Sequence, residues 1–165
     1  MIGLPAVIIG AYSISFINEN LARQFLGLLI LLVFFLSFTK SHNQDRSKPN
    51  PLIVYPLLFI IGFLNGSLSA GTGLLYTLLL TKLYGYTYKE AIGYTLLVVG
   101  LFYNLVGAIV LYLISSIDIS ILPILLLGSF AGGYVGAIVA IKKSNVLIKK
   151  AYQLVTLIVA YKLLF

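Results

Sequence analysis

Glycines and short polar side chains gather in one stretch of this sequence, residues 62–75, which reads GFLNGSLSAGTGLL between the apolar runs PLIVYPLLFI and YTLLL. Glycine lets a backbone turn and approach a ligand closely, and serine and threonine hydroxyls can cap helix ends. If a helix begins near Gly71 to Gly73, its free N–H groups and positive dipole end favour an anion. A glycine-rich packing kink without a ligand is the alternative interpretation.

A second set of small and polar residues lies on the helix expected over residues 90–114. Gly93, Gly100, Asn104 and Gly107 follow one another at spacings of seven, four and three, which predicts one helix face. Such a face lets another backbone come close, and an amide in a membrane helix adds a polar contact. Near the start of this helix, Tyr94 and Thr95 could face a cavity. The face either packs against a neighbour or lines a pathway.

We predict that these two regions form a substrate-binding site. Its candidate residues are Asn65, Gly66, Ser67, Ser69, Gly71, Thr72, Gly73, Thr95 and Asn104.

Residues for catalysis are not found in the sequence. The acidic residues Glu19, Asp45, Glu90 and Asp118 sit at segment ends or in loops, cysteine is absent, and the single histidine, His42, lies in a polar linker. The sequence has no nucleophile–base pair, metal-ligand cluster, phosphate loop or paired carboxylates. We therefore predict no enzyme activity, no catalytic or metal-binding residue and no cofactor.

The composition indicates an integral membrane protein. Of the 165 residues, 61% are hydrophobic and only 9% charged, with a mean hydropathy of +1.08. A soluble domain contains about 25% charged residues, so this chain could not cover its surface with water-compatible groups. The net charge of +7 comes from basic residues in short connections, which indicates orientation by the positive-inside rule and not nucleic-acid binding.

Apolar segments cover residues 2–17, 22–39, 90–114, 119–141 and 151–165, the last extended back to about residue 145. The remaining region, 52–84, would be about 50 Å long as one helix against a hydrocarbon core of about 30 Å, whereas each flank of its glycine-rich break is too short to cross. It forms either one broken crossing or a re-entrant pair of half-helices.

Basic residues favour the re-entrant pair. With re-entry, nine of them lie on one side and only Arg23 and Lys162 on the other, whereas a single crossing divides them seven to four. We therefore predict an all-α, polytopic protein with about five transmembrane helices and one re-entrant pair. Its amino terminus and loops 40–51, 85–89 and 142–150 are expected to be cytoplasmic, and 18–21 and 115–118 outside.

An internal repeat supports this topology. Residues 7–36 align without gaps on 133–162, so that Gly10-Ala11 matches Gly136-Ala137 and Arg23 matches Lys149. Any two apolar hairpins look alike, but the shared Gly-Ala, the equal loop length and the matched basic residue favour duplication. The two hairpin loops would face opposite sides of the membrane, as an inverted repeat requires. Between them, Gly128, Gly132 and Gly136 are expected only to pack against another helix.

The whole chain resembles the TauE/SafE sulfite exporter family of membrane permeases. GFLNGSLSAGTG is similar to the family's glycine-rich loop, EAIGYTLLVVGLFYNLVGAIVLYL to the helix that follows, and LLGSFAGGYVGAIVA with LIKKAYQLVTLIVAYKLL to its closing hairpin. The resemblance implies transport of small sulfur-containing or organic anions by a duplicated protein with two glycine-rich loops. Here Leu74 and Leu75 stand where the family's glycines often continue.

The resemblance also implies a domain organisation. Residues 1–39 resemble the closing hairpin of a first repeat, 40–51 form a polar loop, and 52–165 form a second repeat with the re-entrant loop. The first repeat lacks its own glycine-rich loop. The expected partners are the lipid bilayer, a small anionic substrate, and either a second copy of the chain or a separate N-terminal half. The expected location is a prokaryotic cell membrane. The alternative function is that of a non-transporting membrane subunit, or of one half of a split permease that acts with a partner chain.

Overall fold

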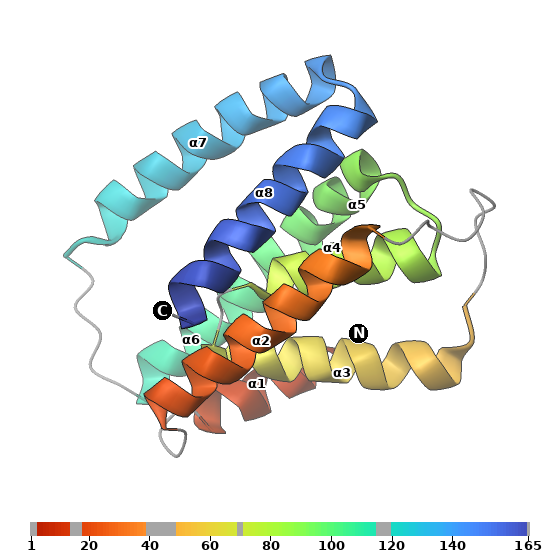
Figure 1. Ribbon diagram of the computed structural model, residues 1–165. Coiled ribbons are helices and arrows are strands. Elements are labelled where there is room, and N and C mark those ends of the chain that lie inside the picture. Colours follow the sequence, from red (N-terminus) through yellow and green to blue (C-terminus); the bar gives the residue numbers. More distant parts are fainter. Residues whose placement is uncertain (1–2, 14–17, 39–48, 69–70, 115–119, 165) are drawn as a thin grey trace.

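A computed structural model describes residues 3–13, 18–38, 49–68, 71–114 and 120–164 (Figure 1). Every secondary-structure element in these ranges is helical, which confirms the predicted all-α class. The helices are α1 (Gly3–Ser13), α2 (Glu19–Phe38), α3 (Pro51–Leu68), α4 (Thr72–Leu83), α5 (Tyr88–Thr95), the π-helix η2 (Leu96–Tyr103), α6 (Asn104–Ile114), α7 (Leu122–Lys142) and α8 (Asn145–Leu164).

Three helices in the described part of the chain are long and apolar enough to cross a membrane: Pro51–Leu68, Tyr88–Ile114 and Leu122–Lys142. Shorter apolar helices cover Gly3–Ser13, Arg23–Phe38 and Thr72–Leu83. At about 16 Å, α1 is shorter than the crossing expected over residues 2–17, of which 14–17 lie outside the described residues. The protein is thus an all-α membrane protein, and its count of five crossings stays a prediction.

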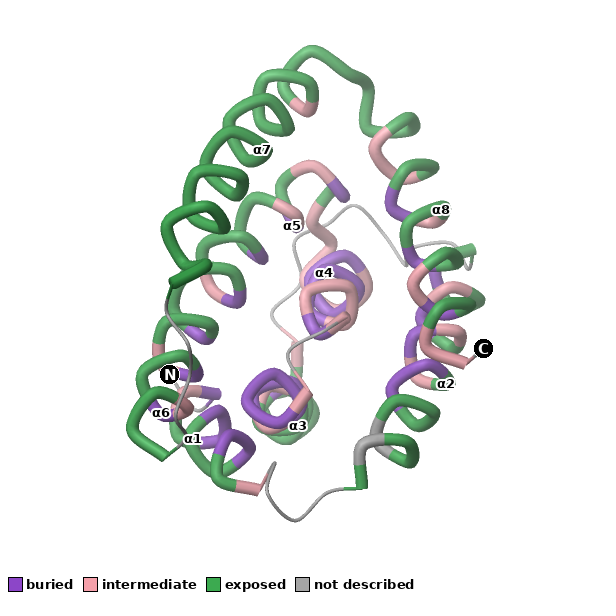
Figure 2. The backbone as a smooth tube through the Cα atoms, turned by 90° about the vertical axis from the view of Figure 1, so that its left-hand side faces the viewer, coloured by how far each residue is buried: buried purple, intermediate pink, exposed green. Residues whose placement is uncertain are grey.

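The glycine-rich stretch breaks the apolar region 52–84 into two helices, as predicted. Helix α3 ends at Leu68 and α4 begins at Thr72. Figure 1 shows α4 folding back along α3, so that the start of α3 and the end of α4 lie on the same side, and Figure 2 looks nearly along both axes. This reversal is expected of a re-entrant pair and not of one broken crossing. The prediction that each flank is too short to cross is wrong for the first flank, because α3 continues to Leu68 and its 18 residues are long enough to cross.

The start of α5 and the turn between α7 and α8 lie together. The Lys89 ammonium donates to the carbonyl oxygens of Ile141 and Lys143 at 2.7 and 3.2 Å, and its backbone N–H donates to the Asn145 side chain at 3.3 Å. Loops 85–89 and 142–150, which the charge pattern assigns to one side of the membrane, therefore meet in space.

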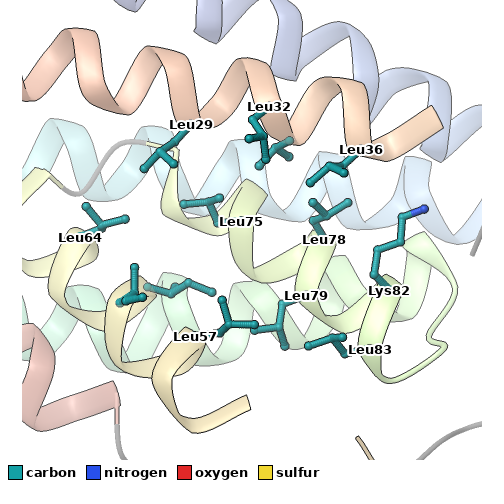
Figure 3. A pocket seen from close by; sticks show the side chains of 13 residues that line it. Leu29, Leu32, Leu36, Leu57, Leu64, Leu75, Leu78, Leu79, Lys82 and Leu83 are labelled. Carbon is teal, nitrogen blue, oxygen red and sulfur yellow. The ribbon is translucent and has the colours of Figure 1, made fainter. Parts of the chain in front are cut away.

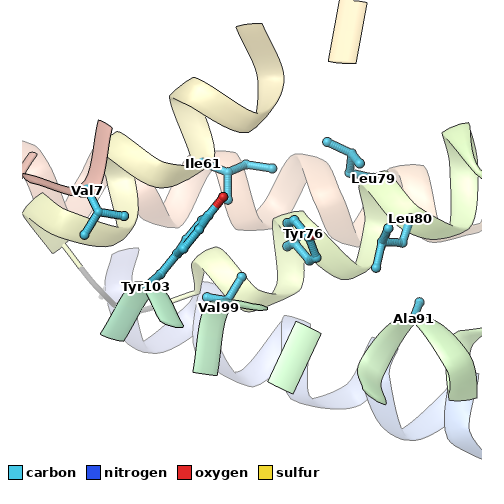
Figure 4. Close-up of a cluster of buried hydrophobic side chains, with 8 residues drawn as sticks. All are labelled: Val7, Ile61, Tyr76, Leu79, Leu80, Ala91, Val99 and Tyr103. Atoms are coloured by element: carbon cyan, nitrogen blue, oxygen red, sulfur yellow. The ribbon is translucent and has the colours of Figure 1, made fainter. Parts of the chain in front are cut away.

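The core of the fold lies around the helical pair. Side chains from α1, α3, α4, α5 and η2 form a buried cluster, shown in Figure 4, that consists of Val7, Ile61, Tyr76, Leu79, Leu80, Ala91, Val99 and Tyr103. On the opposite side of α4, α2 and α8 pack against each other, and Leu26, Ile30 and Ala160 form a smaller cluster between them. The helical pair is therefore covered by apolar side chains on two sides.

Residues 88–114 form one continuous helix whose middle is a π-helix. A capping box fixes its start, because the Thr87 side chain accepts from the Glu90 N–H while the Glu90 carboxylate accepts from the Thr87 N–H. The π-helical turns over 96–103 change the angle between successive side chains. Gly93, Gly100 and Asn104 are exposed and Gly107 is buried, so the four residues differ in exposure, and a single face for all of them stays a prediction.

Candidate functional site

The chain turns between α3 and α4 at Gly71. This residue has φ 79°, a left-handed conformation that only glycine adopts without cost, which explains the glycine at this position. No described side chain caps the amino terminus of α4; the Leu74 N–H instead donates to the Gly71 carbonyl oxygen at 2.9 Å. The half-helix start predicted near Gly71 to Gly73 is confirmed.

Three of the candidate residues form a hydrogen-bonded chain across the break. The Thr72 hydroxyl donates to Asn65 Oδ1 at 2.7 Å, and Asn65 Nδ2 donates to Asn104 Oδ1 at 3.1 Å. Asn65 is 3% and Thr72 0% exposed, whereas Asn104 is exposed. The network joins α3, α4 and α6, and it satisfies polar groups that would be costly in hydrocarbon.

A second pair of candidates consists of Gly73, which directly follows Thr72 in α4, and Thr95 at the end of α5. A Cβ added at Gly73 would lie 3.4 Å from the Thr95 methyl carbon, so α4 and α5 approach closely here. The Thr95 hydroxyl shares a hydrogen bond of 2.9 Å with the Thr77 hydroxyl and also donates to the Ala91 carbonyl oxygen at 2.8 Å. Thr77 was not predicted; a threonine inside an apolar helix was the available signal.

The other candidates have different surroundings. Ser67 is buried and donates to the Phe63 carbonyl oxygen of its own helix at 3.0 Å. Gly66 lies within α3, not at the turn, and a Cβ there would meet Val7 and Ala11 of α1. The structure thus gives Gly66 a packing role. Ser69 lies outside the described residues.

Apolar side chains of α2 cover the start of α4. A Cβ on Gly71 would meet the Ile30 side chain, and both Ile30 and Leu26 are buried beside it. Helix α8 is hydrogen-bonded to the start of α4, because the Tyr152 hydroxyl donates to the Leu74 carbonyl oxygen at 2.7 Å. The start of α4 is therefore packed against α2 and held by α8.

A groove of about 570 Å³ lies between α2 and the helical pair (Figure 3). Leucine, isoleucine and valine side chains line it. Among the described residues that line the groove, Lys82 is the one that carries a charge. None of the eight described candidate residues belongs to this lining. A surface of this kind suits hydrocarbon better than a small hydrated anion.

A smaller cavity of about 240 Å³ is lined by four tyrosines and three leucines. The tyrosines are Tyr76, Tyr84, Tyr86 and Tyr94, with ring centroids of Tyr86 and Tyr94 5.1 Å apart. Their hydroxyls can donate hydrogen bonds to an anion. Sequence reasoning named only Tyr94; the density of tyrosines between residues 76 and 94 was the signal for the others.

The sequence profile of the family described as "Sulfite exporter TauE/SafE" matches residues 1–163. The chain belongs to this family. It is also 23% identical over 161 residues to "Probable membrane transporter protein YfcA" from three Escherichia coli strains, K12, CFT073 and O157:H7. These alignments cover 94% of the chain but 59% of the relatives, so the chain spans less than two thirds of their length. No solved structure matches it.

Family membership agrees with the resemblance drawn from the glycine-rich stretch. In this TauE/SafE chain the stretch forms the turn of the α3–α4 pair, and the candidates Asn65, Thr72 and Asn104 are joined around that turn.

Proposed function

We propose that this TauE/SafE chain forms part of a membrane permease for small anions, with sulfite and organosulfonates as the substrate class, in a prokaryotic cell membrane. The family description and the names and bacterial origin of the relatives support this proposal. Transport is favoured over catalysis because the described residues contain no metal-binding group of histidines, cysteines or acids and the polar network consists of amides and hydroxyls.

The direction of the hydrogen bonds in this network carries the proposal. Thr72 donates to the oxygen of Asn65, and Asn65 donates to the oxygen of Asn104, so the chain of bonds ends on the Asn104 amide nitrogen. That nitrogen belongs to an exposed side chain, and no described residue accepts from it. Facing hydrocarbon, an amide without a partner costs several kcal/mol. We therefore place Asn104 on a polar pathway, where its N–H groups would donate to a passing anion.

One experiment tests this role. The full chain is reconstituted in vesicles, and uptake of radiolabelled sulfite is compared between wild type, Asn104→Leu and Asn104→Asp. We expect at least a tenfold loss in both variants, because leucine removes the donor and aspartate adds a charge that repels the anion. Leu105→Ala, an exposed apolar neighbour on the same helix, is the control and should stay within twofold. Sulfite uptake retained in Asn104→Asp would refute the role of Asn104.

A second candidate function is that of a subunit that transports only together with a partner chain. The exposure of α7, which buries no residue, favours this candidate. Sulfite uptake by the wild-type chain alone would argue against it. A lack of uptake by correctly folded wild-type protein would refute transport by the chain alone and favour the subunit.

A further inference from the structure

Helix α7 is exposed along its whole length. It has the length and apolar composition of a membrane-spanning helix, yet it buries no residue (Figure 2). A Cβ added at any of its four glycines, Gly128, Gly132, Gly133 and Gly136, would meet nothing within 4 Å. Glycines usually let a second helix approach closely in membrane proteins, so four of them facing open space need an explanation.

The internal repeat supplies a comparison within the same molecule. The repeat, with an offset of 126 residues, places Leu26 and Ile30 of α2 on Tyr152 and Thr156 of α8. All four residues are buried, and the two helices pack against each other. Figure 1 shows that α2 and α8 run in opposite directions, as the two members of an inverted repeat would. Residues of α2 and α8 that the repeat makes equivalent are therefore buried alike.

The same offset relates α1 to α7. It places the five buried residues of α1 on five small residues of α7, which we name the small-residue face. The buried residues are Gly3, Ala6, Val7, Gly10 and Ala11, and the small-residue face consists of Ser129, Gly132, Gly133, Gly136 and Ala137.

In α1 this face receives α3 at backbone distance. A Cβ added at Gly62 would lie 3.0 Å from the Gly3 Cα, and one added at Gly66 would lie 2.8 Å from the Ala11 nitrogen. A Cβ on Gly10 would in turn meet the Phe63 backbone. Glycines on both helices therefore allow this contact. On α7 the equivalent face is present, and the helix that should lie on it is not among the described residues.

We infer that the small-residue face of α7 is the docking site for a partner helix, an apolar, glycine-bearing helix of the α3 type that is not among the described residues and does not come from a second copy of this chain. A second copy of this chain is a poorer occupant, because its own α3 already presents Gly62 and Gly66 to its own α1. The inference concerns contact and not substrate, so its test is independent of sulfite uptake.

The probe for this site is a dye-labelled synthetic peptide with the α3 sequence, residues 51–68, added to the full chain in detergent micelles. Micelles impose no membrane orientation, so the peptide can approach α1 or α7 in either direction. Fluorescence anisotropy measures its affinity for wild type and for two matched variants. Ala137→Leu adds bulk on the small-residue face, and Ala131→Leu adds the same bulk on the opposite face of α7. Both positions are exposed, so neither variant replaces a buried side chain of α7.

We expect the peptide to bind wild type and Ala131→Leu with affinities within twofold, and Ala137→Leu at least tenfold more weakly. A peptide carrying Gly62→Leu and Gly66→Leu should also lose at least tenfold. Equal binding to both α7 variants would overturn the inference, since the peptide would then occupy another surface. No binding to wild type would overturn it as well. Dimerisation of the chain without peptide, abolished by Ala137→Leu, would show that a second copy is the occupant and would overturn the assignment to a partner.

Discussion

Replacing Gly71 with alanine should destabilise the turn between α3 and α4 for two separable reasons. The left-handed backbone at φ 79° costs an alanine about 1–2 kcal/mol. Its Cβ would also meet the Ile30 Cδ1 atom and lie 3.1 Å from Cγ1, closer than the 3.4 Å at which ordinary contact begins. Overpacking of this kind costs about 1–3 kcal/mol, so the free energy of unfolding should fall by about 2–5 kcal/mol in total.

Valine at position 30 separates the two causes, because Ile30→Val deletes the Cδ1 atom that the new Cβ would meet. Alone, Ile30→Val should cost about 0.5–1.5 kcal/mol. Combined with Gly71→Ala it should relieve the collision and leave the backbone strain, so the double variant should lose at least about 1 kcal/mol less than the sum of the single variants.

The assay is unfolding of the purified chain in mixed micelles of rising SDS content, followed by the circular dichroism of its helices. Gly73→Ala is the control, because this residue lies inside α4 and its added Cβ would make only an ordinary contact at 3.4 Å. It should be neutral or stabilise the protein by up to about 1 kcal/mol. A neutral Gly71→Ala, or additive losses in the double variant, would refute the account of this turn.

Three further predictions test other contacts. Gly66→Ala should destabilise the chain by about 1–3 kcal/mol relative to Gly93→Ala, because only the first Cβ would meet another helix; equal unfolding midpoints would contradict this. Tyr152→Phe should lower the free energy of unfolding by about 1 kcal/mol through loss of its bond to α4, and an unchanged midpoint would count against that bond. Single cysteines at Asn50 and Thr87, both exposed in a chain without native cysteine, should label from the same side of the membrane; labelling from opposite sides would exclude a re-entrant pair.

The class of the protein, the break in its helices and its family could be predicted from the sequence because each depends on local composition. A chain that is 61% hydrophobic and 9% charged must lie in a membrane, and a 33-residue apolar region interrupted by glycines cannot remain one helix. Gly71 was predictable for the same reason, since a left-handed turn selects glycine wherever it occurs.

The partners of the polar and small residues depended on tertiary structure. In the sequence, Ser67 is as strong a candidate as Asn65, Thr72 and Asn104, because all four are polar residues in apolar segments. The packing of α3, α4 and α6 joins the other three by hydrogen bonds, whereas Ser67 donates to a carbonyl oxygen of its own helix. The π-helix likewise changes which side chains share a face, and no residue type between 96 and 103 predicts a π-helix. Gly66 and Gly136 show the limit most plainly, because a glycine's neighbour is supplied by another helix: Gly66 meets α1, and Gly136 meets open space.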